Sequence, residues 1–342
     1  MAIAESHTST HHDDHHHDHG EFIAHHFDNA EQQFDSGKLG IWVFLVTEIL
    51  FFSGLFVAYT LYRNHHPEIF AQAHVYLDKV LGGINTVVLL FSSLTMALAV
   101  RAAQLGKNKQ CGTYTLVTMF CAAIFLGVKA VEYSHKWTMG IFVRSSFELG
   151  QSSYQTQSPL ALSLGISDYL LYLSVIPALL LVLFVVWSVI AGFVNQPNLS
   201  KLMMGLAITA SGFFVGAVGG EVYERNLAGH HGGDHHDHDH DHAMSDVLQL
   251  QAAAPLVGGG GEVDPSKLHP NIGIFFSIYY CMTGLHAIHI LAGIAALAWI
   301  YWRSIKNHWR SDYFGPVDYV GLYWHLVDLI WIFLFPLLYL ID

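Results

Sequence analysis

Seven stretches of mainly apolar residues run along the chain, and each is bounded by polar flanks. A helix needs roughly 20 mostly apolar residues to cross the hydrocarbon core of a bilayer. Only 12% of the residues are charged, whereas a typical soluble domain has about 25%. We therefore predict an all-α fold, a polytopic transmembrane helix bundle of about seven spans. The expected spans are 39–62, 82–104, 112–133, 168–194, 202–220, 272–302 and 317–341.

Two tracts rich in histidine and aspartate hold much of the acid behind the formal net charge of −12. The tract HHDDHHHDH at 11–19 lies in an N-terminal stretch with too few large apolar residues to fold alone, so we expect disorder there. The tract HHGGDHHDHDHDH at 230–242 lies in a long low-complexity loop. Neutral imidazoles in such tracts can bind metal ions weakly. The candidates are His11, His12, His15, His16, His17, His235, His236, His238, His240 and His242.

The remaining charges bear on partners and on orientation. Outside the two tracts they are close to balanced, and no basic patch predicts binding to nucleic acid. The short loops at 101–111 and 303–312 are the richest in lysine and arginine, which is typical of cytoplasmic loops. With seven spans, we expect the N-terminus in the cytoplasm and the C-terminus outside.

Ionisable side chains within the spans cost about 3 kcal/mol each on insertion scales, so each needs a partner, a cavity or a function. Glu48 lies near the middle of the first span and shares a helical face with Phe51 and Phe52. It is a candidate for proton handling or regulation, or else a neutral acid that bonds within the bundle. Lys129 and Glu132, three residues apart, can partly neutralise each other. The simpler interpretation has the lysine extend to the membrane interface.

Four further polar residues fall in the last two spans. His286 shares a helical face with His289, and His325 shares one with Asp328. Imidazole and carboxylate groups could form a metal site there. Hydrogen bonding between helices, or contact with lipid head groups, is the alternative. In the fifth span GFFVG at 212–216 has small residues four apart, which predicts close packing of helices within the chain.

The last span carries the most specific pattern. The segment DYVGLYWHLVDLIWIFLFPLLYL at 318–340 resembles the final helix of subunit III of the haem–copper oxidases. It places Trp324, His325, Asp328 and Trp331 in the WH-x-x-D-x-x-W pattern of that family.

Other segments are similar to stretches of the same family. FFSIYYCMTGLHAIHILAG at 275–293 is similar to its Gly-x-His-x-x-His helix and places His286 and His289 on the two histidines. TEILFF at 47–52 resembles its S-E-V-x-F-F stretch and places Glu48 on the intramembrane glutamate. Two shorter runs complete the resemblance: INTVVLLFSS at 84–93 and VEY at 131–133.

The resemblance covers 38–137 and 271–342, which hold five of the expected helices. The two helices with which the long form of the family begins have no counterpart, so the chain resembles the short bacterial form with two inserted helices. We expect four segments: a disordered tail at 1–37, the first three family helices at 38–137, an insertion at 138–270 with two extra helices and a His-rich external loop, and the last two family helices at 271–342.

The resemblance implies a subunit III of a cytochrome c oxidase complex in the bacterial plasma (inner) membrane. This subunit would contain no catalytic residue and bind no cofactor, because haem and copper reside in the partner subunits I and II. Cytochrome c or quinol would donate electrons to the complex, which reduces oxygen to water and pumps protons. Glu48 would be the carboxyl tied to proton uptake. Lipid-facing or cleft-lining positions, with structural phospholipid, would fall to Glu132, His286, His289, Trp324, His325, Asp328 and Trp331.

Alternatives stay open at this point. An accessory subunit of a nitric oxide reductase or quinol oxidase would share the final helices, although the length of the chain and its two extra spans count against the nitric oxide reductase subunit. A metal-ion transporter would combine intramembrane histidine and aspartate with His-rich loops. Transporters gather several ligands near the midplane, and the sequence shows no such set.

Overall fold

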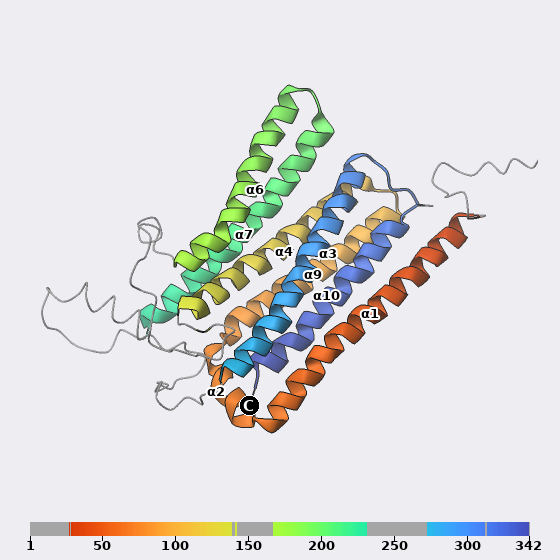
Figure 1. Ribbon diagram of the computed structural model, residues 1–342. Coiled ribbons are helices and arrows are strands. Elements are labelled where there is room, and N and C mark those ends of the chain that lie inside the picture. The colour runs from red at the N-terminus through yellow and green to blue at the C-terminus, as the bar shows by residue number, and fades with distance from the viewer. Residues whose placement is uncertain are drawn as a thin grey trace, which may run out of the picture.

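The computed structural model describes residues 27, 29–138, 141, 167–230, 272–311 and 313–341. Seven of the described helices are long and apolar enough to cross a membrane, and the described residues contain no β-strand. The predicted all-α polytopic bundle is therefore confirmed (Figure 1). In chain order the elements are α1 (Ala30–His65), α2 (Pro67–Ala73), the 3₁₀ turn η1 (His74–Tyr76), α3 (Lys79–Gln104), α4 (Asn108–Thr138), α6 (Asp168–Phe193), α7 (Pro197–His230), α9 (Gly273–Ile305) and α10 (Gly315–Tyr339).

Three tight turns reverse the chain between successive long helices. Gly106 lies between α3 and α4, Asn195 between α6 and α7, and Asn307 between α9 and α10. Their φ angles are positive, at 66°, 59° and 53°. Glycine and asparagine adopt this left-handed conformation at the C-terminal ends of helices more readily than other residues. Each pair of helices therefore runs antiparallel, side by side (Figure 1).

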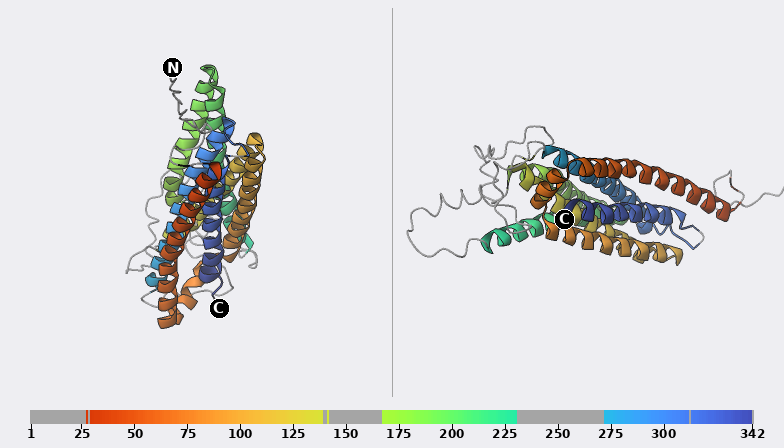
Figure 2. Two further views of the ribbon diagram at one scale, coloured as in Figure 1. Left: turned by 90° about the vertical axis from the view of Figure 1, so that its right-hand side faces the viewer. Right: turned by 90° about the horizontal axis from the view of Figure 1, so that it is seen from below.

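Helices α3, α4, α9 and α10 form the core of the bundle. Helix α1 lies along α10 and α9, whereas α7 packs on α4 (Figures 1 and 2). Helix α6 is outermost because it packs mainly on α7. The most apolar stretch of α6 is only 6% buried within the chain, against 67% for α4. The side chains of α6 therefore face whatever surrounds the chain in the membrane.

Glycines on both helices allow the close contact between α7 and α4. Gly212 and Gly216 of α7 lie against the backbone carbonyl groups of Phe120 and Ile124, and Gly127 of α4 lies against the backbone of α7. A Cβ atom at Gly212 would come within 2.7 Å of the Phe120 carbonyl oxygen, which is shorter than an ordinary van der Waals contact. The close packing within the chain that GFFVG predicts is confirmed.

A short helical segment, α2 and η1, covers the end of the bundle between α1 and α3. None of the expected spans includes it, because it is far too short to cross a membrane. Pro67 takes its first helical position, where a missing N–H costs nothing. Phe70 is buried and packs edge-on against Tyr59 of α1 and Phe275 of α9, with ring centroids 5.3 and 5.2 Å apart.

The helices extend beyond the apolar stretches that predict them. Helix α1 begins at Ala30, after Asn29 accepts a hydrogen bond of 2.7 Å from the Gln32 amide. Its first turns therefore take up part of the segment 1–37 for which disorder is expected. Helix α4 continues to Thr138 and so places Lys136 in a helix. All ten histidines proposed as metal candidates lie outside the described residues, and their role stays a prediction.

Candidate functional site

Glu48 of α1 and His289 of α9 meet within the spanning region. Nε2 of His289 lies 2.9 Å from Oε2 of Glu48. Nδ1 of the same ring lies 2.8 Å from the carbonyl oxygen of Leu285, which can only accept, so Nδ1 carries a proton. The contact with Glu48 then requires one further proton between Nε2 and the carboxyl oxygen. Glu48 and His289 are therefore a proton-sharing pair.

Aromatic side chains surround the pair on the side of the core. Phe52 packs edge-on against the His289 ring, with centroids 5.1 Å apart. Tyr323 of α10 donates a hydrogen bond of 3.1 Å to the His289 carbonyl oxygen. The side chains of Glu48 and His289 remain 19% and 15% exposed. The pair is thus held rigidly in apolar surroundings, yet it can be reached from the surface of the bundle.

His325 and Asp328 of α10 both bond to serines of α3. Nδ1 of His325 lies 2.6 Å from Oγ of Ser93. Oγ of Ser92 donates to Oδ2 of Asp328 over 3.4 Å and accepts from the indole N–H of Trp324 over 3.2 Å. The hydrogen bonds join α10 to α3, as the alternative to a metal site on this face predicts.

His286 points into the core, away from its neighbour His289. Its ring is fully buried between Phe125 and Trp331, at centroid distances of 5.5 and 5.3 Å. The indole N–H of Trp331 donates to Thr86 of α3 over 3.0 Å. The four proposed metal ligands of the last two spans thus lie in separate surroundings. Among the described residues no three His, Cys, Asp or Glu side chains gather where they could hold a metal ion.

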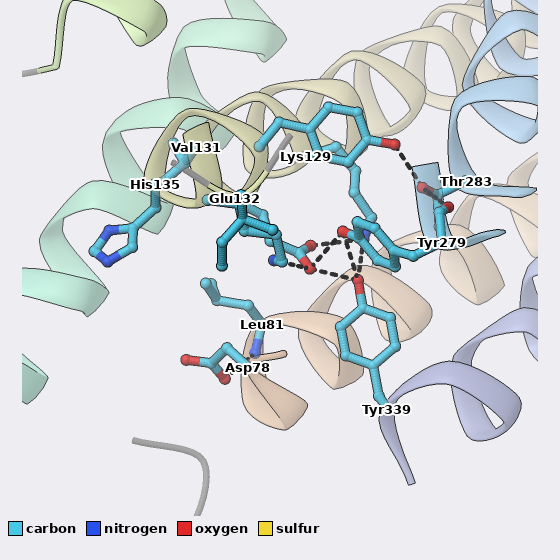
Figure 3. A network of polar contacts seen from close by, with 12 residues as sticks. Asp78, Leu81, Lys129, Val131, Glu132, His135, Tyr279, Thr283 and Tyr339 are labelled. Atoms are coloured by element: carbon cyan, nitrogen blue, oxygen red, sulfur yellow. Dashed lines mark hydrogen bonds and ion pairs between the residues drawn. The ribbon is translucent and has the colours of Figure 1, made fainter. Parts of the chain in front are cut away.

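A second group of buried charges lies where α4 ends and α9 begins (Figure 3). One oxygen of Glu132 accepts from Lys129 over 2.6 Å, and the other accepts from Lys136 over 2.9 Å. The hydroxyls of Tyr279 and Tyr339 donate to this second oxygen, over 2.8 and 2.6 Å. All three charged residues are buried. We call these five residues the lysine network, in which two lysine amines share one carboxylate.

The lysine network corrects the interpretation of Lys129. This side chain does not extend to the interface: it bonds to Glu132 and Tyr339, and its Nζ lies 4.5 Å from the centre of the Trp331 ring. An aromatic face and a carboxylate together replace the water that the ammonium loses. The alternative that Lys129 and Glu132 neutralise each other is confirmed.

The residues predicted to face lipid or to line a cleft differ in burial, and their role stays a prediction. Five of the seven lie inside the bundle with at most 3% of their surface exposed: Glu132, His286, Trp324, Asp328 and Trp331. They are buried because each contacts a neighbouring helix through a hydrogen bond or a ring. Only His289 and His325 are half-buried.

Three members of the lysine network were missed in the sequence. Lys136 follows Glu132 by four residues, and this spacing on a helix predicts an ion pair, so a signal was present. Tyr279 and Tyr339 lie 147 and 207 residues from Glu132 along the chain. No local pattern marks them, because only the packing of α9 and α10 on α4 brings them to the carboxylate.

Comparison with known families finds a match in the last two helices. Residues 266–342, which contain α9 and α10, match the family model described as cytochrome c oxidase subunit III. His286 and His289 of α9 lie within the matched region, as do His325 and Asp328 of α10.

Curated proteins with similar segments bear the name cytochrome c oxidase subunit 3. That of Thermostichus vulcanus is 39% identical over 70 residues, 20% of this chain and 35% of the relative. That of Synechocystis sp. is 40% identical over 70 residues, 20% of this chain and 30% of the relative. That of Rhipicephalus sanguineus is 43% identical over 80 residues, 23% of this chain and 31% of the relative. The chain thus spans about a third of the length of these relatives.

Proposed function

We propose that the chain is the non-redox third subunit of a haem–copper terminal oxidase, because its residues 266–342 match the cytochrome c oxidase subunit III family. In this proposal subunits I and II hold the haem and copper, cytochrome c or quinol supplies electrons, and oxygen is reduced to water. This chain supports proton uptake by the catalytic subunit and keeps that subunit active during turnover.

The contact of Glu48 with His289 is the observation that carries the proposal. A carboxylate beside an imidazolium and a carboxylic acid beside a neutral imidazole have the same net charge, so a proton can pass between Oε2 of Glu48 and Nε2 of His289 without changing the charge of the pair. Both side chains are partly exposed, so the pair is accessible from the surface of the bundle. Such a pair suits a group that collects protons at the surface of a membrane subunit.

The end of the bundle that carries the turns after α3 and α9 supports the proposed orientation. The turns after α3 and α9 lie side by side, since Asn108 and the backbone of Trp309 form two hydrogen bonds, of 2.9 and 2.8 Å. Both turns carry lysine and arginine, which favours a cytoplasmic position for this end. We place the N-terminus there and the C-terminus on the opposite side of a bacterial plasma membrane.

Structural phospholipid is part of the proposal. The most apolar stretch of α1 is only 11% buried within the chain. Lipid chains or the partner subunits would cover this surface in the complex.

The test replaces Glu48 and follows the oxidase through many turnovers. We expect Glu48→Ala and Glu48→Gln to leave the haem spectrum and the subunit composition unchanged, but to lower severalfold the number of turnovers before inactivation. His289→Gln should have the same effect, because it removes the proton partner. Glu31→Gln, at the exposed start of α1, is the matched control.

Two results would reject this role. A lifetime of Glu48→Gln equal to that of Glu31→Gln would show that the Glu48 carboxyl has no part in proton uptake. Loss of the assembled complex in both Glu48 variants would make Glu48 a structural residue.

A further inference from the structure

Three buried polar side chains in the core have no use in the proposed function. Asn85 of α3 and His286 of α9 are completely buried, and Asp328 of α10 is 2% exposed. Five of their polar atoms have no hydrogen-bond partner within the described part of the chain. These are both polar atoms of the Asn85 amide, both ring nitrogens of His286, and Oδ1 of Asp328. Unsatisfied polar atoms are costly in a protein interior, and those that persist call for a further ligand.

Packing places these side chains along one interior seam. His286 and the Nζ of Lys129 both contact the Trp331 ring, at 5.3 Å between ring centroids and 4.5 Å to the ring centroid. Asp328 precedes Trp331 by three residues and so lies on the same face of α10. The Trp331 indole donates to Thr86, the residue after Asn85, and Asp328 contacts Ser92 two turns further along α3. The seam therefore runs from the lysine network past His286 to Asp328.

The charges along the seam balance only if Asp328 is counted. The lysine network has two amines and one carboxylate, which leaves one positive charge in excess when both amines are protonated. Ser92 is a distant partner of the Asp328 carboxyl, at 3.4 Å. A deprotonated Asp328 would compensate the excess ammonium, whereas a protonated Asp328 requires one neutral amine.

Several titratable groups face this region from the surrounding helices. The cap residue of α3, Asp78, interacts with Glu132, and α1 contributes Glu48 through its contact with His289. The groups on the other helices are Cys121, Lys129, Glu132, Tyr133 and Lys136 of α4, Tyr279, Tyr280, His286 and His289 of α9, and His325, Asp328 and Tyr339 of α10.

We propose that Asn85, His286 and Asp328 bind ordered internal water, and that this water lets Asp328 exchange a proton with the lysine network through His286. Polar atoms from three helices offer water the two to four partners that buried water molecules usually have. The exchange conserves the number of protons and the net charge of these groups. The carboxylic acid gives its proton to one nitrogen of His286, the other nitrogen releases a proton, and the neutral amine of Lys129 becomes an ammonium.

This route for proton exchange between Asp328 and the lysine network is separate from the Glu48 and His289 pair, which lies toward α1. It does not depend on the identity of the catalytic subunit, so the proposed function and this inference can fail independently. The polar atom that links the two ends is a ring nitrogen of His286, and no side chain competes for it within the described residues.

The first test is a density map of the complete oxidase complex at a resolution that shows water. We expect water molecules within hydrogen-bond distance of Asn85, His286 and Oδ1 of Asp328. A dry seam would overturn the proposal. The test uses the wild-type protein, so it holds even where variants fail to fold.

The second test is infrared spectroscopy of the complex in lipid membranes, in ordinary and in heavy water. A band of a protonated carboxylic acid should shift on deuteration, disappear in Asp328→Asn, and respond to Lys129→Met. His286→Phe should slow the deuterium exchange of this band at least severalfold. His325→Asn, on the same helix and bonded to Ser93, is the matched control and should leave both unchanged. A band that never exchanges, or one that exchanges equally fast in His286→Phe, would overturn the proposal.

Discussion

The four core helices and the α6–α7 pair are held together by different means. Between the core helices, hydrogen bonds accompany the apolar contacts, as from Tyr279 and Tyr339 to Glu132 and from Trp324 to Ser92. The α6–α7 pair approaches α4 through glycines, and within the described residues its one ion pair with the core lies at the end of α7, between Glu224 and His135 over 2.8 Å. Buried polar contacts specify which helices meet, whereas glycine contacts require only a complementary surface.

This difference bears on how the two regions can change. The match to the oxidase family lies in α9 and α10 of the core, and α6 and α7 lie outside it. A helix pair that contacts the core mainly through glycines, with its ion pair to His135 partly exposed, can be gained or lost without disturbing the buried charges of the lysine network. A core that contains the lysine network cannot lose the Glu132 carboxylate without leaving the buried lysines without a counter-charge. Four substitutions test this comparison, and the last test concerns the parent complex.

The largest effect is expected for Glu132→Gln in the core. The substitution leaves two buried ammonium groups without a carboxylate, which should cost about 3–5 kcal/mol of stability. Unfolding of the purified chain in mixed detergent micelles would measure it. Glu224→Gln is the matched control, because Glu224 is near the same end of the bundle but bonds to His135. Equal stability of the two variants would show that the core does not depend on its buried charges.

A smaller effect is expected for Gly216→Ala in α7. The added Cβ would collide with the backbone of Ile124, so the helices must separate, at a cost of about 1–3 kcal/mol. Gly219→Ala is the control, since nothing lies within 4 Å of a Cβ there. The same unfolding assay compares the two variants. If Gly216→Ala matched its control, the glycine contact would not hold the pair to the core.

A polar contact inside the α6–α7 pair sharpens the comparison further. Ser188 and Ser200 each donate a hydrogen bond of 3.0 Å to the backbone carbonyl of the other. Ser188→Ala should cost about 0.5–1.5 kcal/mol, the usual worth of one such bond. Ser211→Ala removes a hydroxyl that bonds only within its own helix, to Ile208, and should have no effect. A larger loss than that of Gly216→Ala would reverse the proposed ranking.

The smallest effect concerns Asp78, which lies outside the membrane-spanning segments and caps α3 by accepting from the Val80 and Leu81 amides. Burial, the largest cause, raises the pKa of its carboxyl above the usual 3.8, and Glu224 and Glu132 add to this. The folded state therefore binds the proton more tightly, so this group lowers stability as the pH rises from the unfolded pKa through the folded one.

Asp78→Asn should keep the cap and remove this loss. We expect the melting temperature of the variant to equal that of the wild type at about pH 3 and to exceed it slightly at about pH 7. Asp78→Ala lacks the cap as well as the carboxyl, so it should be less stable than Asp78→Asn by about 1 kcal/mol at both pH values. A wild-type advantage over Asp78→Asn that grows with pH would contradict the direction of the pKa shift.

The sequence was sufficient for the helices but not for most of their contacts. Long apolar runs predict spans because the bilayer demands them, and GFFVG predicts close packing because small residues at this spacing form a flat face. The partner of Glu48 could not be predicted, since His289 is 241 residues away and a histidine at that spacing has many possible neighbours.

The burial of Lys129 is a second feature that the sequence could not predict. Read alone, a lysine near the end of a span is expected at the interface. The structure buries it because Tyr339 and Trp331, both from the last helix, supply a hydroxyl and an aromatic face beside Glu132. Such compensation joins residues of α4 and α10 and leaves no periodic signal in either helix.

The most direct test of the proposed role is purification of the tagged full chain in mild detergent from the membranes that contain it, followed by an optical spectrum and mass spectrometry. The account predicts haem absorbance together with a catalytic subunit of a haem–copper oxidase. A nitric oxide reductase subunit in its place would assign the chain to that alternative complex. A colourless chain that purifies alone, above all one that carries zinc, would contradict the account and favour metal-ion transport.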